Sequence, residues 1–154
     1  MKKQIVLGLS SVGGAGYLPK APGTFGTLVA LPVWWLFSDF KLLPYILVTA
    51  ALILLAIWAS AEANKIYEDH DASQIVIDEV VGLLCAAVAV PFRWQQVIVV
   101  FLLFRFFDIL KPPPVRWLDK NVKGGTGVVL DDVVAGLQAC GCVHMARLLY
   151  GSWW

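Results

Sequence analysis

The chain has 154 residues, of which 59% are hydrophobic and only 15% are charged, and its mean hydropathy is +0.75. A typical soluble domain is about 45–50% apolar and about 25% charged, and a small domain has too much surface to hide the excess. The composition therefore predicts one membrane-embedded domain, residues 1–154, with a very apolar soluble helical domain as the alternative. A net charge of +1 gives no sign of nucleic-acid binding.

The N-terminal residues 4–23 are interrupted by glycines and are expected to be loop-like. They lead into KAPGTFGT at 20–27, where Thr24 or Thr27 could cap the helix that follows. Gly23 and Gly26 permit a close approach to the backbone of this stretch. Free N–H groups at the helix start, with Lys20 nearby, would form an anion site. A helix start with nothing bound is the alternative.

Five apolar segments follow, at about 25–38, 43–61, 79–92, 95–111 and 131–149. The second carries no charge over YILVTAALILLAIWASA and is the clearest candidate to span a membrane. The first and third are short for a full span. The predicted fold class is all-α: a compact multi-helix membrane protein of about five apolar helices with polar cytoplasmic loops.

If all five segments cross or dip into the membrane, residues 1–24, 62–78 and 111–131 lie on one side. That side holds eight of the twelve basic residues: Lys2, Lys3, Lys20, Lys65, Lys111, Arg116, Lys120 and Lys123. The positive-inside rule makes it cytoplasmic. Of the eleven acids, only Asp39 falls on the far side. That rule does not predict the distribution of the acids, whereas a functional cytoplasmic face does.

Two stretches echo each other, IVIDEVVGLL at 75–84 and VVLDDVVAGL at 128–137. In both, paired acids open an apolar helix, and a small residue (Gly82 or Ala135) follows the first acid by four positions, on the same face. The missing bulk would leave room for an ion, a phosphate or a neighbouring helix. The alternative is that the acids complement the helix dipole and the small residue serves packing.

Arg105 lies roughly 9 Å along a helix from Lys111, inside an apolar segment. An arginine at that depth is costly unless it faces a wet or protein-lined interior. Asp108, three residues on, can pair with it. We interpret the two residues as an arginine fork aimed at phosphate oxygens and held by Asp108, with a purely structural ion pair as the alternative.

The acids of the predicted cytoplasmic face are Asp69, Asp71, Asp78, Glu79, Asp108, Asp119, Asp131 and Asp132. Crowded carboxylates resist ionising together, and a divalent cation removes that conflict. Oxygen ligands without thiolates or paired histidines favour Mg²⁺ over Zn²⁺, and the three cysteines lie in apolar segments, where they are expected to be inert. Lysine and arginine beside such a metal suit phosphoryl chemistry.

Neither a Cys-x₅-Arg loop nor a DxDxT motif is present, which leaves metal-activated water attacking a phosphomonoester. A Mg²⁺-dependent phospholipid-headgroup transferase is a rival, although its DG-x₂-AR signature is absent. A non-enzymatic ion-binding membrane protein is another, although its acids should line a path across the bilayer rather than gather on one side.

Seven short blocks occur in order: PGTFGT at 22–27, HD at 70–71, IDE-V-G at 77–82, FR-FD-KP at 104–112, P-RW-D at 114–119, GG-G at 124–127 and DD-AG at 131–136. Together they resemble the phosphatidylglycerophosphatase A family, bacterial membrane enzymes that remove the terminal phosphate of phosphatidylglycerophosphate. The resemblance implies an all-helical fold, Mg²⁺ dependence and formation of phosphatidylglycerol at the cytoplasmic leaflet of the inner membrane. It also implies a metal site near Asp78, Glu79, Asp131 and Asp132, with Arg105, Asp108 and Lys111 close to the phosphate.

We therefore predict that Asp78, Glu79 and Asp131 hold Mg²⁺, with Asp132 as a further ligand or as a partner of one. Phosphate binding is assigned to Lys20, Thr24, Arg105 and Lys111, and the catalytic set to Asp71, Arg105, Asp108 and Lys111. Within that set, Asp108 or Asp71 would orient the water or fix Arg105. The glycines at 124–127 form a loop that would close over the site; a turn without ligand contact is the alternative.

Overall fold

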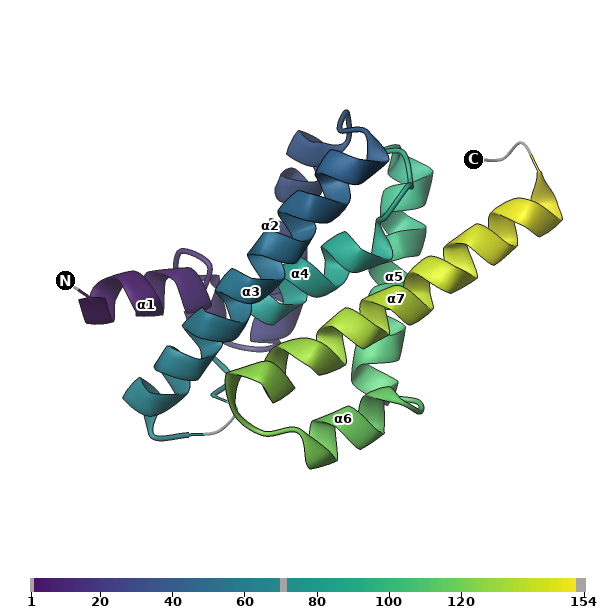
Figure 1. Cartoon of the computed structure of the whole chain (residues 1–154). Coiled ribbons are helices and arrows are strands. Elements are labelled where there is room, and N and C mark those ends of the chain that lie inside the picture. The colour runs from purple at the N-terminus through teal and green to yellow at the C-terminus, as the bar shows by residue number, and fades with distance from the viewer. Residues whose placement is uncertain (1, 70–71, 152–154) are drawn as a thin grey trace.

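The chain is all-helical in a computed structural model, which describes residues 2–69 and 72–151 (Figure 1). The helices in this part of the chain are α1 (Lys2–Ser10), α2 (Pro22–Phe37), α3 (Leu42–Tyr67), α4 (Ile77–Ala86), α5 (Trp94–Leu110), α6 (Val115–Asn121) and α7 (Gly124–Tyr150), with one 3₁₀ turn, η1 (Ala15–Tyr17). No strand occurs among the described residues. The predicted all-α class is confirmed.

The expectation that residues 4–23 are loop-like is wrong, because α1 occupies Lys2–Ser10. Val6 of this helix is 1% exposed and packs with Ala56 and Ala59 of α3. The small side chains of α3 allow this close contact. Burial of apolar surface favours folding by about 25 cal/mol per Å², which stabilises a short helix that would be marginal alone.

The start of α7 also differs from the prediction. The helix begins at Gly124, so the GG-G block is its first turn and not a loop. A Cβ atom on Gly125 would lie 2.4 Å from both Ala61 N and Ile57 O of α3. Only glycine fits this approach, and the contact fixes the first turn of α7 against α3.

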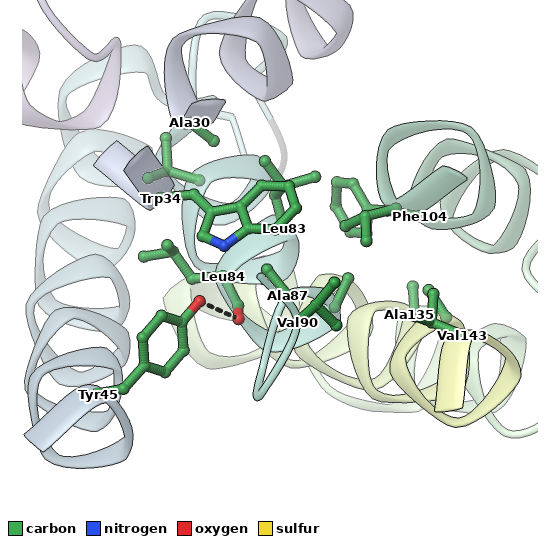
Figure 2. Packing of buried hydrophobic residues seen from close by; sticks show 14 of the residues in the cluster. Ala30, Trp34, Tyr45, Leu83, Leu84, Ala87, Val90, Phe104, Ala135 and Val143 are labelled. Atoms are coloured by element: carbon green, nitrogen blue, oxygen red, sulfur yellow. Dashed lines mark hydrogen bonds between the residues drawn. The ribbon is translucent and has the colours of Figure 1, made fainter. Parts of the chain in front are cut away.

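Short helix α4 lies in the middle of the bundle, and all ten of its residues are buried. Its Leu83 and Leu84 belong to a core that also contains Trp34 of α2, Phe104 of α5 and Ala135 of α7 (Figure 2). The hydroxyl of Tyr45 on α3 donates to the carbonyl of Leu84 over 2.9 Å (Figure 2).

Two helices, α3 and α7, are long and apolar enough to cross a membrane. The ten residues of α4 cover about 15 Å, half of the roughly 30 Å of a hydrocarbon core. Helix α3 turns large apolar side chains outward, with Leu43 67% and Leu54 70% exposed. A soluble protein would hide such a surface. How many of the five predicted apolar helices cross the bilayer stays a prediction.

Candidate functional site

A polar cavity of about 380 Å³ lies where one set of helix ends meets. It collects residues from the start of α2, the loop before α4, the end of α5, α6 and the start of α7. Six acids and three lysines line it: Asp78, Glu79, Asp108, Asp119, Asp131 and Asp132, with Lys111, Lys120 and Lys123. These elements belong to the side that the sequence predicts to be cytoplasmic.

A backbone crossing between α4 and α7 brings the two acid pairs, Asp78–Glu79 and Asp131–Asp132, together. A Cβ on Gly136 would lie 2.1 Å from Gly82 O, and a Cβ on Gly82 would lie 2.6 Å from the Phe104 ring. Of the three explanations for the small residue after each acid pair, the neighbouring helix is therefore the one observed at Gly82. In the second stretch Gly136, next to the expected Ala135, makes the close contact.

The similarity between the stretches at 75–84 and 128–137 extends to their local geometry. Asp78 Oδ1 accepts a hydrogen bond from the backbone N–H of Glu79 over 3.0 Å. Asp131 Oδ1 accepts one from the N–H of Asp132 over 3.1 Å. All four acids are buried, and Asp132 Oδ2 has no hydrogen-bond partner among the described residues. A buried, unpaired carboxylate oxygen is costly, which indicates a place for a cation.

Glu79 is held by α2 and α5. Arg105 Nη1 donates to Glu79 Oε2 and lies 2.8 Å from Asp108 Oδ2. Thr27 Oγ1 is 2.9 Å from Glu79 Oε2, and a Cβ on Gly23 would lie 2.0 Å from Glu79 Oε1. The close approach expected at the PGTFGT block is thus made to this carboxylate. Burial, and then the charge of Asp108, raise the pKa of Glu79 to about 7, although Arg105 acts in the opposite direction.

Lys111 joins α5 to α6 and α7. Its Nζ donates to Asp131 Oδ2 over 2.7 Å and also to Asp119. Burial alone would lower the pKa of Lys111, but the hydrogen bonds to Asp119 and Asp131 raise it above its ordinary value. The lysine is therefore a permanent cation inside the cavity, with part of its side chain still accessible.

The predicted site residues separate into groups. Seven of them line the cavity or contact residues that do: Asp78, Glu79, Arg105, Asp108, Lys111, Asp131 and Asp132. Lys20 is exposed and Thr24 half-buried, and neither lines the cavity. Helix α2 begins at Pro22 with Ala21 before it and no side-chain cap, so the expected cap at Thr24 or Thr27 is wrong. Asp71 lies outside the described residues.

Arg105 itself does not line the cavity; it lies behind Glu79 and Asp108. Two lysines that do line it, Lys120 and Lys123, were missed as site residues. Their sequence signal was the presence of two lysines within the four residues before the GG-G block. Within residues 2–69 and 72–151, no group of three or more Asp, Glu, His or Cys side chains is arranged so that it could bind a metal ion. The lysine and arginine instead neutralise part of the acid cluster.

The fold and cavity define an all-helical protein suited to a membrane, with a charged site at one end of its bundle. Residues 8–147 match the family model described as Phosphatidylglycerophosphatase A. The chain belongs to the phosphatidylglycerophosphatase A family and is therefore a phosphatase.

Relatives support this membership. The chain is 38% identical over 132 residues to Phosphatidylglycerophosphatase A of Escherichia coli K12, covering 85% of this chain and 77% of the relative. It is 37% identical over 128 residues to the protein of that name in Haemophilus influenzae Rd, covering 82% and 78%. A Bacteroides thetaiotaomicron protein, provisionally named a phosphatidylinositol-3-phosphatase, is 41% identical over 148 residues, covering 90% and 91%. No solved structure shows significant similarity to the chain.

Proposed function

We propose that this protein hydrolyses the terminal phosphomonoester of phosphatidylglycerophosphate in a Mg²⁺-dependent reaction. The products are phosphatidylglycerol and inorganic phosphate, and the reaction serves phospholipid biosynthesis at the cytoplasmic face of a bacterial inner membrane. One observation carries the proposal beyond family membership: six acids and three lysines line one cavity at the end of an apolar bundle.

The charge of that cavity supports a divalent cation. Its acids outnumber its lysines two to one, and a phosphomonoester would add further negative charge. Asp78, Glu79, Asp131 and Asp132 offer oxygen donors, the type that Mg²⁺ prefers, and the unpartnered Oδ2 of Asp132 fits such a role. These four residues would hold the ion, which when bound would lower the pKa of a water and neutralise charge on the phosphate.

The side chains of the protein have separate tasks in this proposal. Lys111, partly accessible between Asp119 and Asp131, binds a phosphate oxygen. Arg105 holds Glu79 and Asp108 in place from behind and adds positive potential. Asp108, which lines the cavity, orients the attacking water. Asp71, as an alternative to Asp108 for orienting the water, and Lys20 and Thr24, as outer phosphate contacts, remain parts of the proposal.

The apolar exterior positions the lipid. Leu43, Leu47 and Leu54 of α3 point outward, at 67%, 60% and 70% exposure, and would contact bilayer lipids. We infer that the five apolar helices embed the bundle at different depths, so that the acyl chains stay in the bilayer. Only the headgroup then enters the cavity.

A second candidate substrate is a phosphatidylinositol phosphate, because the Bacteroides relative with that name is 41% identical over 90% of this chain. Both lipids present a phosphomonoester on a polyol. The cavity chemistry described above serves either one.

Phosphate release by the purified protein in detergent tests the proposal. We expect release from phosphatidylglycerophosphate with Mg²⁺, none with excess EDTA, and slower release from phosphatidylinositol 3-phosphate. Asp132→Asn should abolish release while the protein stays folded. A well-folded protein that releases phosphate from no lipid phosphomonoester would end the proposal, and full activity in EDTA would remove the metal.

A further inference from the structure

We propose that Lys120 and Lys123 form a second anion site at the mouth of the polar cavity, which binds the phosphodiester of the lipid substrate. The site is distinct from the deeper position where the phosphomonoester reacts. This inference rests on the proposed function. It adds that one cavity binds both anions of the substrate, the phosphomonoester and the phosphodiester.

The cations of the cavity are not equivalent. Lys111 already donates to Asp119 and Asp131, so an anion bound there shares the lysine with two acids. Arg105, which lies behind the cavity, donates to Glu79. Lys120 and Lys123 line the same cavity, and neither forms an ion pair with any residue in the described part of the chain. Their charges are therefore available to a ligand.

Depth separates the two positions. Asp131 and Asp132 are 6% and 5% exposed, at the inner end of the cavity. Lys120 at the end of α6 and Lys123 just before α7 are both exposed, so they lie nearer the opening of the cavity than the buried acids do. Gly124, the first residue of α7, also lines the cavity. The N–H groups in the first turn of a helix lack intrahelical partners and carry partial positive charge, so the start of α7 adds positive potential beside the two lysines.

The two phosphate groups of the substrate follow each other in the same order as the two positions in the cavity. The phosphomonoester must reach the buried acids, because hydrolysis occurs there. The phosphodiester links the headgroup glycerol to the diacylglycerol, so it lies between the reacting phosphate and the bilayer. In the bound lipid it therefore passes the mouth of the cavity. A phosphodiester carries a single, permanent negative charge, and a lysine ammonium matches it as a point charge without special geometry.

Two soluble probes, each with one of the two anions, separate the positions. Short-chain dihexanoylphosphatidylglycerol carries only the phosphodiester, and inorganic phosphate stands for the monoester. Their dissociation constants are measured calorimetrically with the full-length protein in an uncharged detergent, with Mg²⁺ present. This readout does not require turnover, so the anion site is tested even if phosphatidylglycerophosphate is not hydrolysed.

We expect the double variant Lys120→Gln/Lys123→Gln to bind dihexanoylphosphatidylglycerol about tenfold more weakly, because each solvent-screened ion pair contributes up to about a few-fold. Inorganic phosphate should bind within about twofold of the unchanged protein. The double variant Lys120→Arg/Lys123→Arg, which keeps both charges, should retain lipid binding. It also serves as the charged counterpart if the glutamine variant is poorly folded.

Arg116→Gln is the matched control, because Arg116 is an exposed cation on the same helix α6 but does not line the cavity. It should leave both dissociation constants unchanged. An equal loss of lipid binding in Arg116→Gln would show that general surface charge is responsible, and would overturn the site. Parallel weakening of phosphate and lipid in the glutamine variant would also overturn it, since the lysines would then serve the monoester.

Discussion

Gly136 of α7 and Gly82 of α4 meet backbone to backbone: a Cβ on Gly136 would lie only 2.1 Å from the carbonyl oxygen of Gly82. This contact sets the separation of the two helices that carry the acid pairs. The geometry of the cavity therefore depends on two residues that have no side chain.

Gly136→Ala should separate α4 from α7 and lower the free energy of unfolding by about 1–3 kcal/mol, the usual range for overpacking. Phosphatase activity should fall with it, because Asp131 and Asp132 move relative to Asp78. Thermal unfolding in detergent and phosphate release measure both effects.

Gly141→Ala on the same helix is the control, since nothing lies within 4 Å of a Cβ there. Alanine is the better helix former by about 0.5–1 kcal/mol, so this variant should be slightly more stable and fully active. Equal stability of the Gly136 and Gly141 variants would contradict the close crossing.

Asp132→Asn and Asp131→Asn should both lose activity but differ in stability. Asp132 Oδ2 is buried without a hydrogen-bond partner among the described residues, so removing its charge should keep or raise stability in EDTA. Asp131 bonds Lys111, so its loss leaves a partly buried ammonium poorly paired and should destabilise the protein by about 1–3 kcal/mol. Melting temperatures in EDTA, beside activities in Mg²⁺, distinguish the two. A destabilised Asp132→Asn protein would contradict the unpaired state of the Asp132 carboxylate.

Stability without metal should depend on pH through Glu79. The pKa of Glu79 is raised from 4.5 to about 7 by burial and by the charge of Asp108. Between these two values the folded protein binds more protons than the unfolded chain, so stability falls as pH rises. The melting temperature in EDTA should thus decrease from pH 5 to pH 8.

Glu79→Gln should weaken this dependence because the side chain at position 79 no longer titrates. Added Mg²⁺ should offset the decrease at pH 8 if Glu79 is a ligand. A melting temperature that rises across the same range in the unmodified, metal-free protein would contradict the assignment to Glu79.

Lys111→Met should reduce turnover by about 10²-fold or more, the range seen when a group that stabilises the transition state is removed. The same substitution at Lys20, which is exposed and outside the cavity lining, should have little effect. Steady-state kinetics on phosphatidylglycerophosphate compare the two variants directly. A large loss at Lys20 with little at Lys111 would contradict the assignment of Lys111 as the phosphate-binding lysine.

The acid pairs and their helical setting could be predicted from sequence because they depend on local periodicity. Asp78 and Asp131 each accept the N–H of the next residue, and this geometry needs no distant partner. The start of α7 could not be predicted in this way. Glycines weaken isolated helices, so the sequence predicts a loop at residues 124–127. Packing of Gly125 against α3 outweighs that preference. Helix α1 has the same explanation, through burial of Val6 against α3.

The sequence by itself determined which groups exist: an apolar chain, two acid pairs on apolar helices, and a surplus of lysines on one side. Only the tertiary structure decided which of these groups face each other. It joined Lys111 to Asp119 and Asp131 and placed Arg105 behind Glu79, while Lys120 and Lys123 stayed without an ion pair among the described residues. The physical reason is that Coulomb attraction depends on the distance between charges and desolvation depends on burial. Both the distances and the burial are fixed only when the helices pack together.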